Sequence, residues 1–379
     1  MSEIGKAFKK ASVVNPPVGW TPGLTFDGHQ GTLILTPGPG KGTNEAPGQD
    51  KWDEILRLHG YDPEHFYVFN DRVGQTTHVK DGKIYQVWYK VQFARKMSSL
   101  AEDDSLREYI RGPRKPVKAE TDNWLHIVLT DQHVGKSAAA GGGTDTIAQR
   151  WIDGVVKAIR GRKWKGINLA FAGDIIEGYV SQNGANIMNT DLTLPDQLIT
   201  ATRLVVETIN LALESAEQVV VAAVPGNHGE TTRTQKVPMK DNFDIYIVQA
   251  AQAQFERWLP GAHLSFNYPA VEYGEVVYGA GGTNICLVHG HLFKGQTKGA
   301  EEWWRGQIVN ARPPHSAHVL IAGHFHNFQM SNFTYDRWII FGPSLEDESV
   351  WFANQTGATS RPGVYAFEMV DGAPLGAVF

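Results

Sequence analysis

Residues able to bind metal ions follow five apolar segments of the chain, each time directly after the segment ends. Imidazole, carboxylate and amide ligands without thiolate suit borderline to hard divalent ions such as Mn, Fe, Ni or Zn, rather than a structural zinc site. Seven ligands are too many for one tetrahedral ion and fit two ions that share a carboxylate. Two ions about 3.5–4 Å apart can clamp a phosphoryl group during in-line displacement. The candidate ligands are Asp131, His133, Asp174, Asn227, His289, His324 and His326.

The spacing within these motifs suits a shared metal centre. Asp131-x-His133 lets two residues at one strand end reach the same ion, whereas His324-x-His326 lets two histidines diverge toward different ions. Glycine precedes three of the ligands, and its backbone freedom permits the tight turns that push a ligand forward. A lone histidine is more often structural than metal-binding. The prediction therefore rests on the five motifs occurring together, each after an apolar strand.

Alternating strand and helix patterns must position these motifs. Strands that alternate with helices over this length predict a layered α/β domain with a buried sheet. Ligands of open α/β sheets bind at the carboxyl ends of the strands, so the motifs are expected to meet at one rim. The predicted strands are residues 125–129, 167–171, 219–224, 285–288 and 319–321, and the predicted helices are residues 144–160, 194–215 and 241–258.

In this order the motifs resemble the signature of the calcineurin-like metallophosphoesterase superfamily, over residues 122–342. The resemblance implies a four-layer α/β/β/α sandwich with a dinuclear metal centre. It also implies a hydroxide that bridges the two metals and attacks the phosphoester. The motifs that carry the resemblance are Asp131-x-His133, Gly173-Asp174, Gly226-Asn227-His228, His289 and Gly323-His324-x-His326.

The resemblance also divides the ligands between two ions, for which manganese is our expectation and iron, nickel or zinc are the alternatives. The bridging Asp174 and the non-ligand His228 are then the catalytic residues. An imidazole with a pKa near neutrality can stabilise the transition state or protonate the leaving oxygen. The implied ligands are Asp131, His133 and His326 for the first metal, Asn227, His289 and His324 for the second, and Asp174 for both.

One departure from the family pattern affects the surroundings of His228. The family usually has Asp or Glu directly after Gly-Asn-His, whereas this chain has Gly229 there. Either Glu230 or Glu177 could instead supply the carboxylate that orients His228. Arg233, a few residues further on, could hold a flanking phosphate, although a solvated loop is the alternative.

Three further histidines have simpler explanations. His291 follows in His-Gly-His, and we expect it to support the site from outside the ligand set rather than bind metal. His126 lies inside a predicted strand, and His318 precedes one, so both are expected to be structural.

The chain before the predicted catalytic domain has a different character. Proline and glycine without periodicity predict an extended arm over residues 1–49, and a small α+β module is predicted over residues 50–97. A charged linker with a short helix at residues 105–110 is expected over residues 98–121. The metallophosphoesterase domain would then span residues 122–379.

Composition limits the cellular setting. The chain has 379 residues, a formal net charge of −5 and one cysteine, Cys286, which excludes an internal disulfide framework and fits a reducing compartment. Neither a secretory signal nor a transmembrane segment is recognised. We therefore expect a cytoplasmic protein without a membrane partner. If the protein is encoded by a phage, as the resemblance described in the next paragraph suggests, this would be the cytoplasm of the host.

The metal site does not by itself name the substrate. The spacing and the His-Gly-His element are most similar to SbcD-like nucleases of double-strand-break repair, and the preceding module resembles proteins of tailed phages. DNA is thus the expected substrate, with a homodimer and a separate ATPase partner as possibilities by analogy. The alternatives are a phosphoesterase for nucleotides or cyclic nucleotides, and a scaffold that keeps the fold without turnover.

Overall fold

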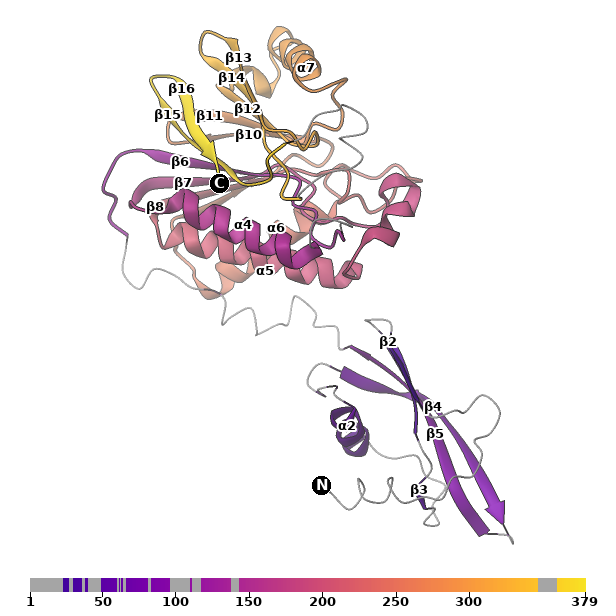
Figure 1. Cartoon of the computed structure of the whole chain (residues 1–379). Coiled ribbons are helices and arrows are strands. Elements are labelled where there is room, and N and C mark those ends of the chain that lie inside the picture. The colour runs from indigo at the N-terminus through magenta and orange to yellow at the C-terminus, as the bar shows by residue number, and fades with distance from the viewer. Residues whose placement is uncertain are drawn as a thin grey trace. The chain divides into compact units, whose positions relative to one another are not determined.

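The chain forms two compact units, Met1–Ser98 and Ser99–Phe379. Their helices and strands are labelled in Figure 1. The computed structural model describes residues 23–26, 30–35, 38–39, 49–59, 61, 63, 66–80, 83–95, 110, 117–137, 143–346 and 360–379.

The N-terminal unit is a sheet packed against one helix. The central strand β5 pairs antiparallel with β2, β3 and β4, and β1 pairs with β2. Trp52 and Leu56 of the helix α2 are buried against Val91 and Phe93 of β5. The elements are β1 (Gly23–Phe26), β2 (Gln30–Ile34), β3 (Gly38–Pro39), α2 (Gln49–Leu58), β4 (Phe66–Lys80) and β5 (Lys83–Arg95).

Part of the segment that the sequence assigns to an extended arm belongs to this sheet. The strands β1, β2 and β3 lie within residues 1–49, and they are too short for their side-chain alternation to stand out from the surrounding prolines and glycines. Their pairing with one another and with β5 provides the hydrogen bonds that hold them, and this pairing depends on tertiary structure. The short helix expected at residues 105–110 lies outside the described residues, apart from Ile110.

The larger unit contains a six-stranded sheet in the order β16-β15-β6-β7-β8-β9. Its strands β6 to β9 are parallel, whereas β15 runs antiparallel to both β6 and β16. The strands are β6 (Trp124–Leu129), β7 (Trp164–Phe171), β8 (Ala216–Ala223), β9 (Leu264–Asn267), β15 (Tyr365–Val370) and β16 (Ala373–Val378).

A second, five-stranded sheet has the order β10-β11-β12-β14-β13. Its three central strands β11, β12 and β14 are parallel, and the two edge strands are antiparallel to their neighbours. The strands are β10 (Glu275–Ala280), β11 (Thr283–Val288), β12 (Val319–Ala322), β13 (Gln329–Thr334) and β14 (Arg337–Phe341).

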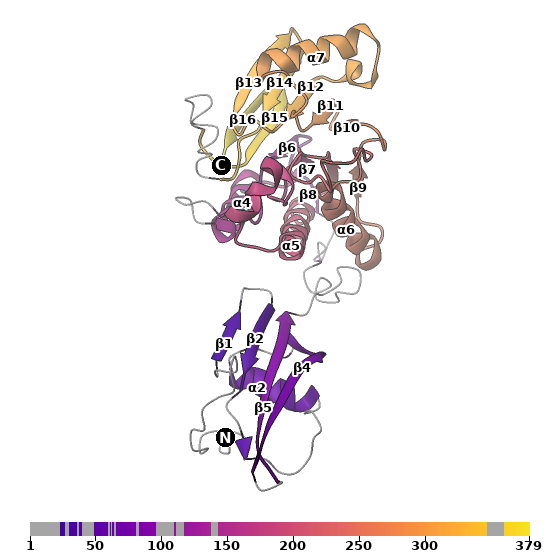
Figure 2. The same cartoon turned by 90° about the vertical axis from the view of Figure 1, so that its right-hand side faces the viewer.

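Helices cover the outer faces of these sheets. Figures 1 and 2 show α4, α5 and α6 along one side of the six-stranded sheet, the five-stranded sheet on its other side, and α7 beyond that. None of the described helices is long and apolar enough to cross a membrane. The helices are α4 (Gly143–Ile159), α5 (Leu194–Leu213), α6 (Phe243–Trp258) and α7 (Thr297–Val309), with short 3₁₀ helices η1 (Ser181–Asn189) and η2 (Pro313–Ser316).

Three buried clusters hold these layers together, and alternation along the strands explains them. In β7, Leu169 faces the helices, whereas its neighbour Ala170 faces the second sheet. Between the sheets, Ala170 packs in a cluster that includes Ile285 and Ile321. On the far side, Trp304 of α7 packs in a third cluster over the outer face of the second sheet. The prediction of a mixed α/β domain is confirmed.

The elements expected to carry the motifs are also confirmed. All five predicted strands and all three predicted helices are present, with ends that differ by at most three residues from the expected ones. Sequence patterns did not reveal α7, β9, β10 or the strands from β13 to β16. Several of these are edge strands with partly exposed faces, for example β13 and β16.

We predict that Trp151→Ala lowers the free energy of unfolding of the larger unit by about 3–5 kcal/mol, because it removes a fully buried ring and leaves a cavity. The Trp151 Nε1–H also donates to Thr208 Oγ1 over 2.9 Å. Trp151→Phe should cost less, since it keeps most of the buried volume. Urea unfolding followed by far-UV circular dichroism measures both; an equal loss for the two variants would contradict the packing role.

Candidate metal centre

The candidate ligands occupy the turns that follow five strands, and most of these turns have strained backbones. Asp131, His133, Asp174, His324 and His326 have φ between 51° and 71°. Among the described non-glycine residues, only Ala311 and Asp371 share a positive φ. Left-handed backbone is uncommon outside glycine and persists where surrounding contacts enforce it. The fold therefore holds these side chains in orientations that an ordinary loop would avoid.

A first group of ligand atoms lies after β6 and β12. Nε2 of His133 and Nε2 of His326 are 3.1 Å apart, and His326 Nε2 is 3.4 Å from Asp131 Oδ1. One potential ligand atom from each of these residues falls within 4.8 Å of the others. This set matches the residues implied for the first metal.

A second group lies after β7, β8, β11 and β12. Nε2 of His289 is 3.1 Å from Asp174 Oδ2 and 3.1 Å from Asn227 Oδ1. His324 joins Asp174 and His289 in a cluster whose ligand atoms lie within 4.8 Å of one another. Asp174 also interacts electrostatically with His133 of the first group. The seven candidate ligands are therefore gathered at one rim.

The hydrogen bonds around these imidazoles leave their Nε2 lone pairs pointing inward. Nδ1 of His289 is 2.8 Å from the carbonyl oxygen of Ala172, which can only accept a hydrogen bond, so Nδ1 carries the proton. Nδ1 of His133 lies 2.9 Å from Glu177 Oε2, and Nδ1 of His326 lies 2.7 Å from Glu346 Oε1. Such carboxylate–histidine pairs fix the tautomer of metal-binding histidines.

The consequence is a site made almost entirely of acceptor atoms. Nε2 of His289 faces two oxygens, and the Nε2 atoms of His133 and His326 face each other. Acceptors at about 3 Å repel unless a cation or proton lies between them. Burial alone lowers the pKa of His289, but the charge of Asp174 outweighs it and raises this pKa to about 9. Protons and metal ions thus compete for the same lone pairs, and these nitrogen and oxygen atoms are ligands that fit divalent metal ions.

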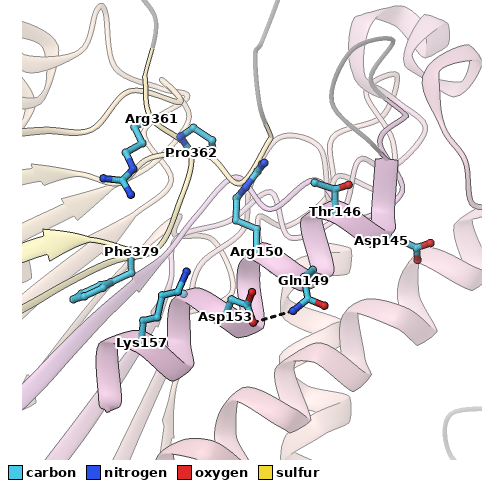
Figure 3. Close-up of a pocket in the computed structure, with 10 residues that line it drawn as sticks. Asp145, Thr146, Gln149, Arg150, Asp153, Lys157, Arg361, Pro362 and Phe379 are labelled. Carbon is cyan, nitrogen blue, oxygen red and sulfur yellow. Dashed lines mark hydrogen bonds between the residues drawn. The ribbon is translucent and has the colours of Figure 1, made fainter. Parts of the chain in front are cut away.

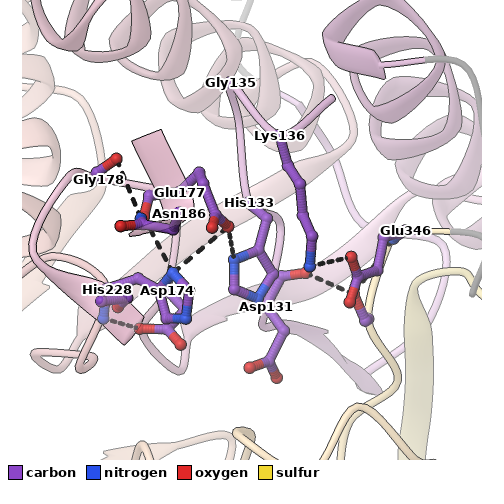
Figure 4. A network of polar contacts seen from close by, with 12 residues as sticks. Asp131, His133, Gly135, Lys136, Asp174, Glu177, Gly178, Asn186, His228 and Glu346 are labelled. Atoms are coloured by element: carbon purple, nitrogen blue, oxygen red, sulfur yellow. Dashed lines mark hydrogen bonds and ion pairs between the residues drawn. The ribbon is translucent and has the colours of Figure 1, made fainter. Parts of the chain in front are cut away.

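His228 lies beside these two groups and forms, with His133 and Glu177, a third cluster whose potential ligand atoms lie within 4.8 Å of one another. The role of a non-ligand that the resemblance implies for His228 therefore stays a prediction. Its ring meets that of His133 edge-on at a centroid distance of 4.5 Å. Its Nδ1 lies 2.9 Å from the carbonyl oxygen of Glu177 and 3.3 Å from Glu177 Oε2 (Figure 4). Burial lowers the pKa of His228, but the charges of Asp174 and Glu177 raise it above its ordinary value.

Of the two carboxylates that could orient His228, Glu177 is the one in contact with it. Glu177 is buried and lies between His133 and His228; burial raises its pKa, but hydrogen bonds and charges from these histidines lower it below its ordinary range. Glu230 instead pairs with Arg233 at 2.8 Å. Arg233 also donates to the carbonyl oxygen of Asn227 over 2.9 Å, which holds its guanidinium at the rim of the site.

The three further histidines considered in the sequence, His291, His126 and His318, belong to neither group of ligands. The ring of His291 lies 5.4 Å from that of His289, and its buried Nδ1 has no hydrogen-bond partner among the described residues. His126 is buried within β6, stacked on Phe367, and burial lowers its pKa to about 4. His318 accepts a hydrogen bond from the backbone of Asn284. His291 therefore borders the centre, whereas His126 and His318 have structural contacts.

Sequence reasoning missed the segment after β14. Glu346 is buried, holds His326 and forms an ion pair with Lys136 (Figure 4). Two residues earlier, Ser344 Oγ donates to the carbonyl oxygen of Asp131 over 2.8 Å. This segment follows a buried parallel strand, so the strand-end rule could have indicated it. The strand Arg337–Phe341 itself was not predicted.

A pocket of about 520 Å³ lies elsewhere, along α4 and the C-terminal segment (Figure 3). Side chains of both charges line it, among them Arg150, Asp153 and Arg361. Arg150 also donates to the carbonyl oxygen of Leu345, next to Glu346. None of the candidate ligands lines this pocket, so it is separate from the metal centre.

Among known proteins, only solved structures are similar to this chain. No protein-family model and no curated protein matches the sequence. A single mutant of Vps29 from Entamoeba histolytica is 15% identical, with 67% of this chain and 99% of that chain covered and a TM-score of 0.30. Wild-type Vps29 of this organism in complex with Zn²⁺ is 15% identical, with 67% and 98% covered and a TM-score of 0.29.

Vps29 from Chaetomium thermophilum is 11% identical, with 68% of this chain and 96% of that chain covered and a TM-score of 0.29. Likenesses of this strength carry no argument about activity. The interpretation of the site therefore rests on its own geometry.

We predict that Glu346→Gln weakens metal binding by about 10–100-fold, the usual effect of losing a partner that orients a metal-bound histidine. A glutamine can still accept from His326 Nδ1, but it no longer attracts the imidazole or Lys136 with a negative charge. Isothermal titration with Mn²⁺ measures the affinity. Glu368→Gln, which removes the surface ion pair with Arg162, is the control and should bind normally; equal affinities in both variants would contradict a role for Glu346.

Proposed function

We propose that this chain is a calcineurin-like metallophosphoesterase that hydrolyses phosphodiester bonds of DNA with two bound metal ions, manganese being our choice. The observation that carries the proposal is the gathering of imidazole nitrogens and carboxylate oxygens in two neighbouring clusters, one formed by Asp131, His133 and His326 and the other by Asp174, His289 and His324. The two packed sheets with outer helices are then the four-layer sandwich of that superfamily. Residues from both sheets contribute to the site, which a single α/β layer could not arrange.

In this proposal the residues divide into ligands and a proton donor. Asp131, His133 and His326 hold the first ion, Asn227, His289 and His324 the second, and Asp174 both. When bound, the ions supply Lewis acidity that polarises the phosphoryl group and activates water.

His228 supplies the acid–base chemistry beside these ligands. Its Nδ1 is engaged by Glu177, so Nε2 is the atom available to stabilise the transition state or to protonate the leaving oxygen. The backbone N–H of His228 donates to Asp174 Oδ1 over 2.7 Å. This bond ties the position of the acid to that of the bridging ligand, and such alignment contributes to catalysis.

Among phosphodiesters, DNA is the substrate that best suits the exposed basic side chains next to the candidate centre. Arg233 is exposed and is held at Asn227 by its hydrogen bond, and Lys236 on the same loop is also exposed. Side chains of this kind contact phosphates on either side of a cleaved bond. A net charge of −5 limits such contacts to local patches.

We predict that the Mn-loaded protein cleaves end-labelled single- or double-stranded DNA and that EDTA abolishes cleavage. Asp174→Asn should abolish activity and lower metal content, because it removes the charge shared by both ions. His228→Ala should abolish activity while both metals are retained. Gel analysis of the products, with metal content measured by plasma mass spectrometry, provides the test.

Three results would change the proposal. Intact DNA together with cleavage of nucleotides or cyclic nucleotides would assign a small-molecule phosphoesterase. Bound metal without cleavage of either substrate class would assign a scaffold. Full activity of His228→Ala would exclude the role given to that residue.

A further inference from the structure

A fully buried carboxylate, Asp244, lies directly beneath the candidate centre, although no sequence motif marks it. It belongs to the first turn of α6. Its Oδ2 accepts the backbone N–H groups of Asp174 and Gly226, each over 2.9 Å. Its Oδ1 accepts the N–H of Ile175, also over 2.9 Å. One side chain thus receives three backbone hydrogen bonds.

The three donors belong to the two loops that carry ligands after β7 and β8. One loop presents Asp174, whose φ of 54° is left-handed, and the other presents Asn227. Hydrogen bonds from N–H groups to a carboxylate are stronger than those to a neutral acceptor. Strained backbone persists only where neighbouring contacts enforce it. Asp244 provides such contacts and connects the loops to each other.

The start of α6 is itself docked onto the second loop. Asn242 Nδ2 donates to the carbonyl oxygen of Gly226 over 2.8 Å, and the N–H of Phe243 donates to that of Gly229 over 2.7 Å. A Cβ atom on Gly229 would lie 2.5 Å from Asn242 Oδ1 and 2.7 Å from Asp244 Oδ2. The absence of a side chain at Gly229 therefore makes room for the carboxylate of Asp244.

We propose that Asp244 is a positioning residue that sets the second half of the metal centre. It holds the backbones of Asp174 and the Asn227 loop at a fixed separation without binding metal itself. The remaining first-metal ligands, Asp131, His133 and His326, lie on other loops, to which Asp244 forms no hydrogen bond in the described part of the chain. Asp174 serves both ions, whereas the Asn227 loop serves the second ion alone, so loss of Asp244 should weaken the second metal more than the first. This inference rests on the proposed two-metal function.

The test is Asp244→Asn, with Mn²⁺ titrated calorimetrically and backbone exchange followed by hydrogen–deuterium mass spectrometry in the metal-free protein. Asparagine has one acceptor oxygen, and its NH₂ group would face N–H donors. We expect the second Mn²⁺ to bind about 10–100-fold more weakly, with the first weakened clearly less. Peptides containing Asp174, Ile175 and Gly226 should exchange at least about 10-fold faster, the loss of one hydrogen bond's protection.

The control is Asp196→Asn, which changes an acidic residue in the first turn of the neighbouring helix α5, where it accepts from Thr193. It should leave both Mn²⁺ sites and the exchange of the three peptides unchanged. Gly229→Ala provides a second variant, since its Cβ displaces Asp244 while keeping the carboxylate; it should reproduce the selective loss.

Unchanged Mn²⁺ binding in Asp244→Asn would overturn the inference, as would equal weakening of both sites with faster exchange throughout the chain. If the wild-type protein binds no Mn²⁺, the proposed function fails instead. Exchange at the three amides then still decides whether Asp244 connects the two loops: selective acceleration supports the connection, and normal exchange refutes it.

Discussion

The mutual repulsion of acceptor atoms gathered at one rim is the constraint on which the site depends. Imidazole nitrogens and carboxylate oxygens approach to about 3 Å, with their lone pairs directed at the same points. Protons can relieve this repulsion, as the raised pKa of His289 indicates, and divalent ions can relieve it as well. A fold that tolerates such crowding must supply rigid supports around it, and those supports explain much of the surrounding structure.

The supports are buried acidic groups and backbone carbonyls behind the ligands. Glu177 contacts the Nδ1 atoms of His133 and His228. Glu346 contacts Nδ1 of His326, and the carbonyl oxygen of Ala172 accepts from Nδ1 of His289. Each fixes a tautomer as well as an orientation, because the atom that it contacts cannot then bind metal. Positive φ angles at five ligands show that the backbone itself is forced into these turns.

The packing of two sheets explains how ligands distant in sequence meet. Small residues on the inner faces, such as Ala170 and Ala222 of the six-stranded sheet, let the second sheet approach closely. The ends of β11 and β12 then lie beside those of β6, β7 and β8, where His289 contacts Asn227 and His326 contacts His133. Apolar burial between the sheets thereby stabilises a polar site at their edge.

The strands that carry the motifs, and the types of ligand at their ends, could be predicted from the amino-acid sequence, because apolar runs and strand-end residues are local patterns. The sequence also indicated Glu177 as a candidate, but could not choose between it and Glu230. Only the tertiary structure made that choice, and only it revealed Glu346 and Ser344, which approach from a strand more than 200 residues after Asp131. It also drew part of the expected arm into a sheet. Contacts of this kind depend on which surfaces pack together, and no local pattern records that.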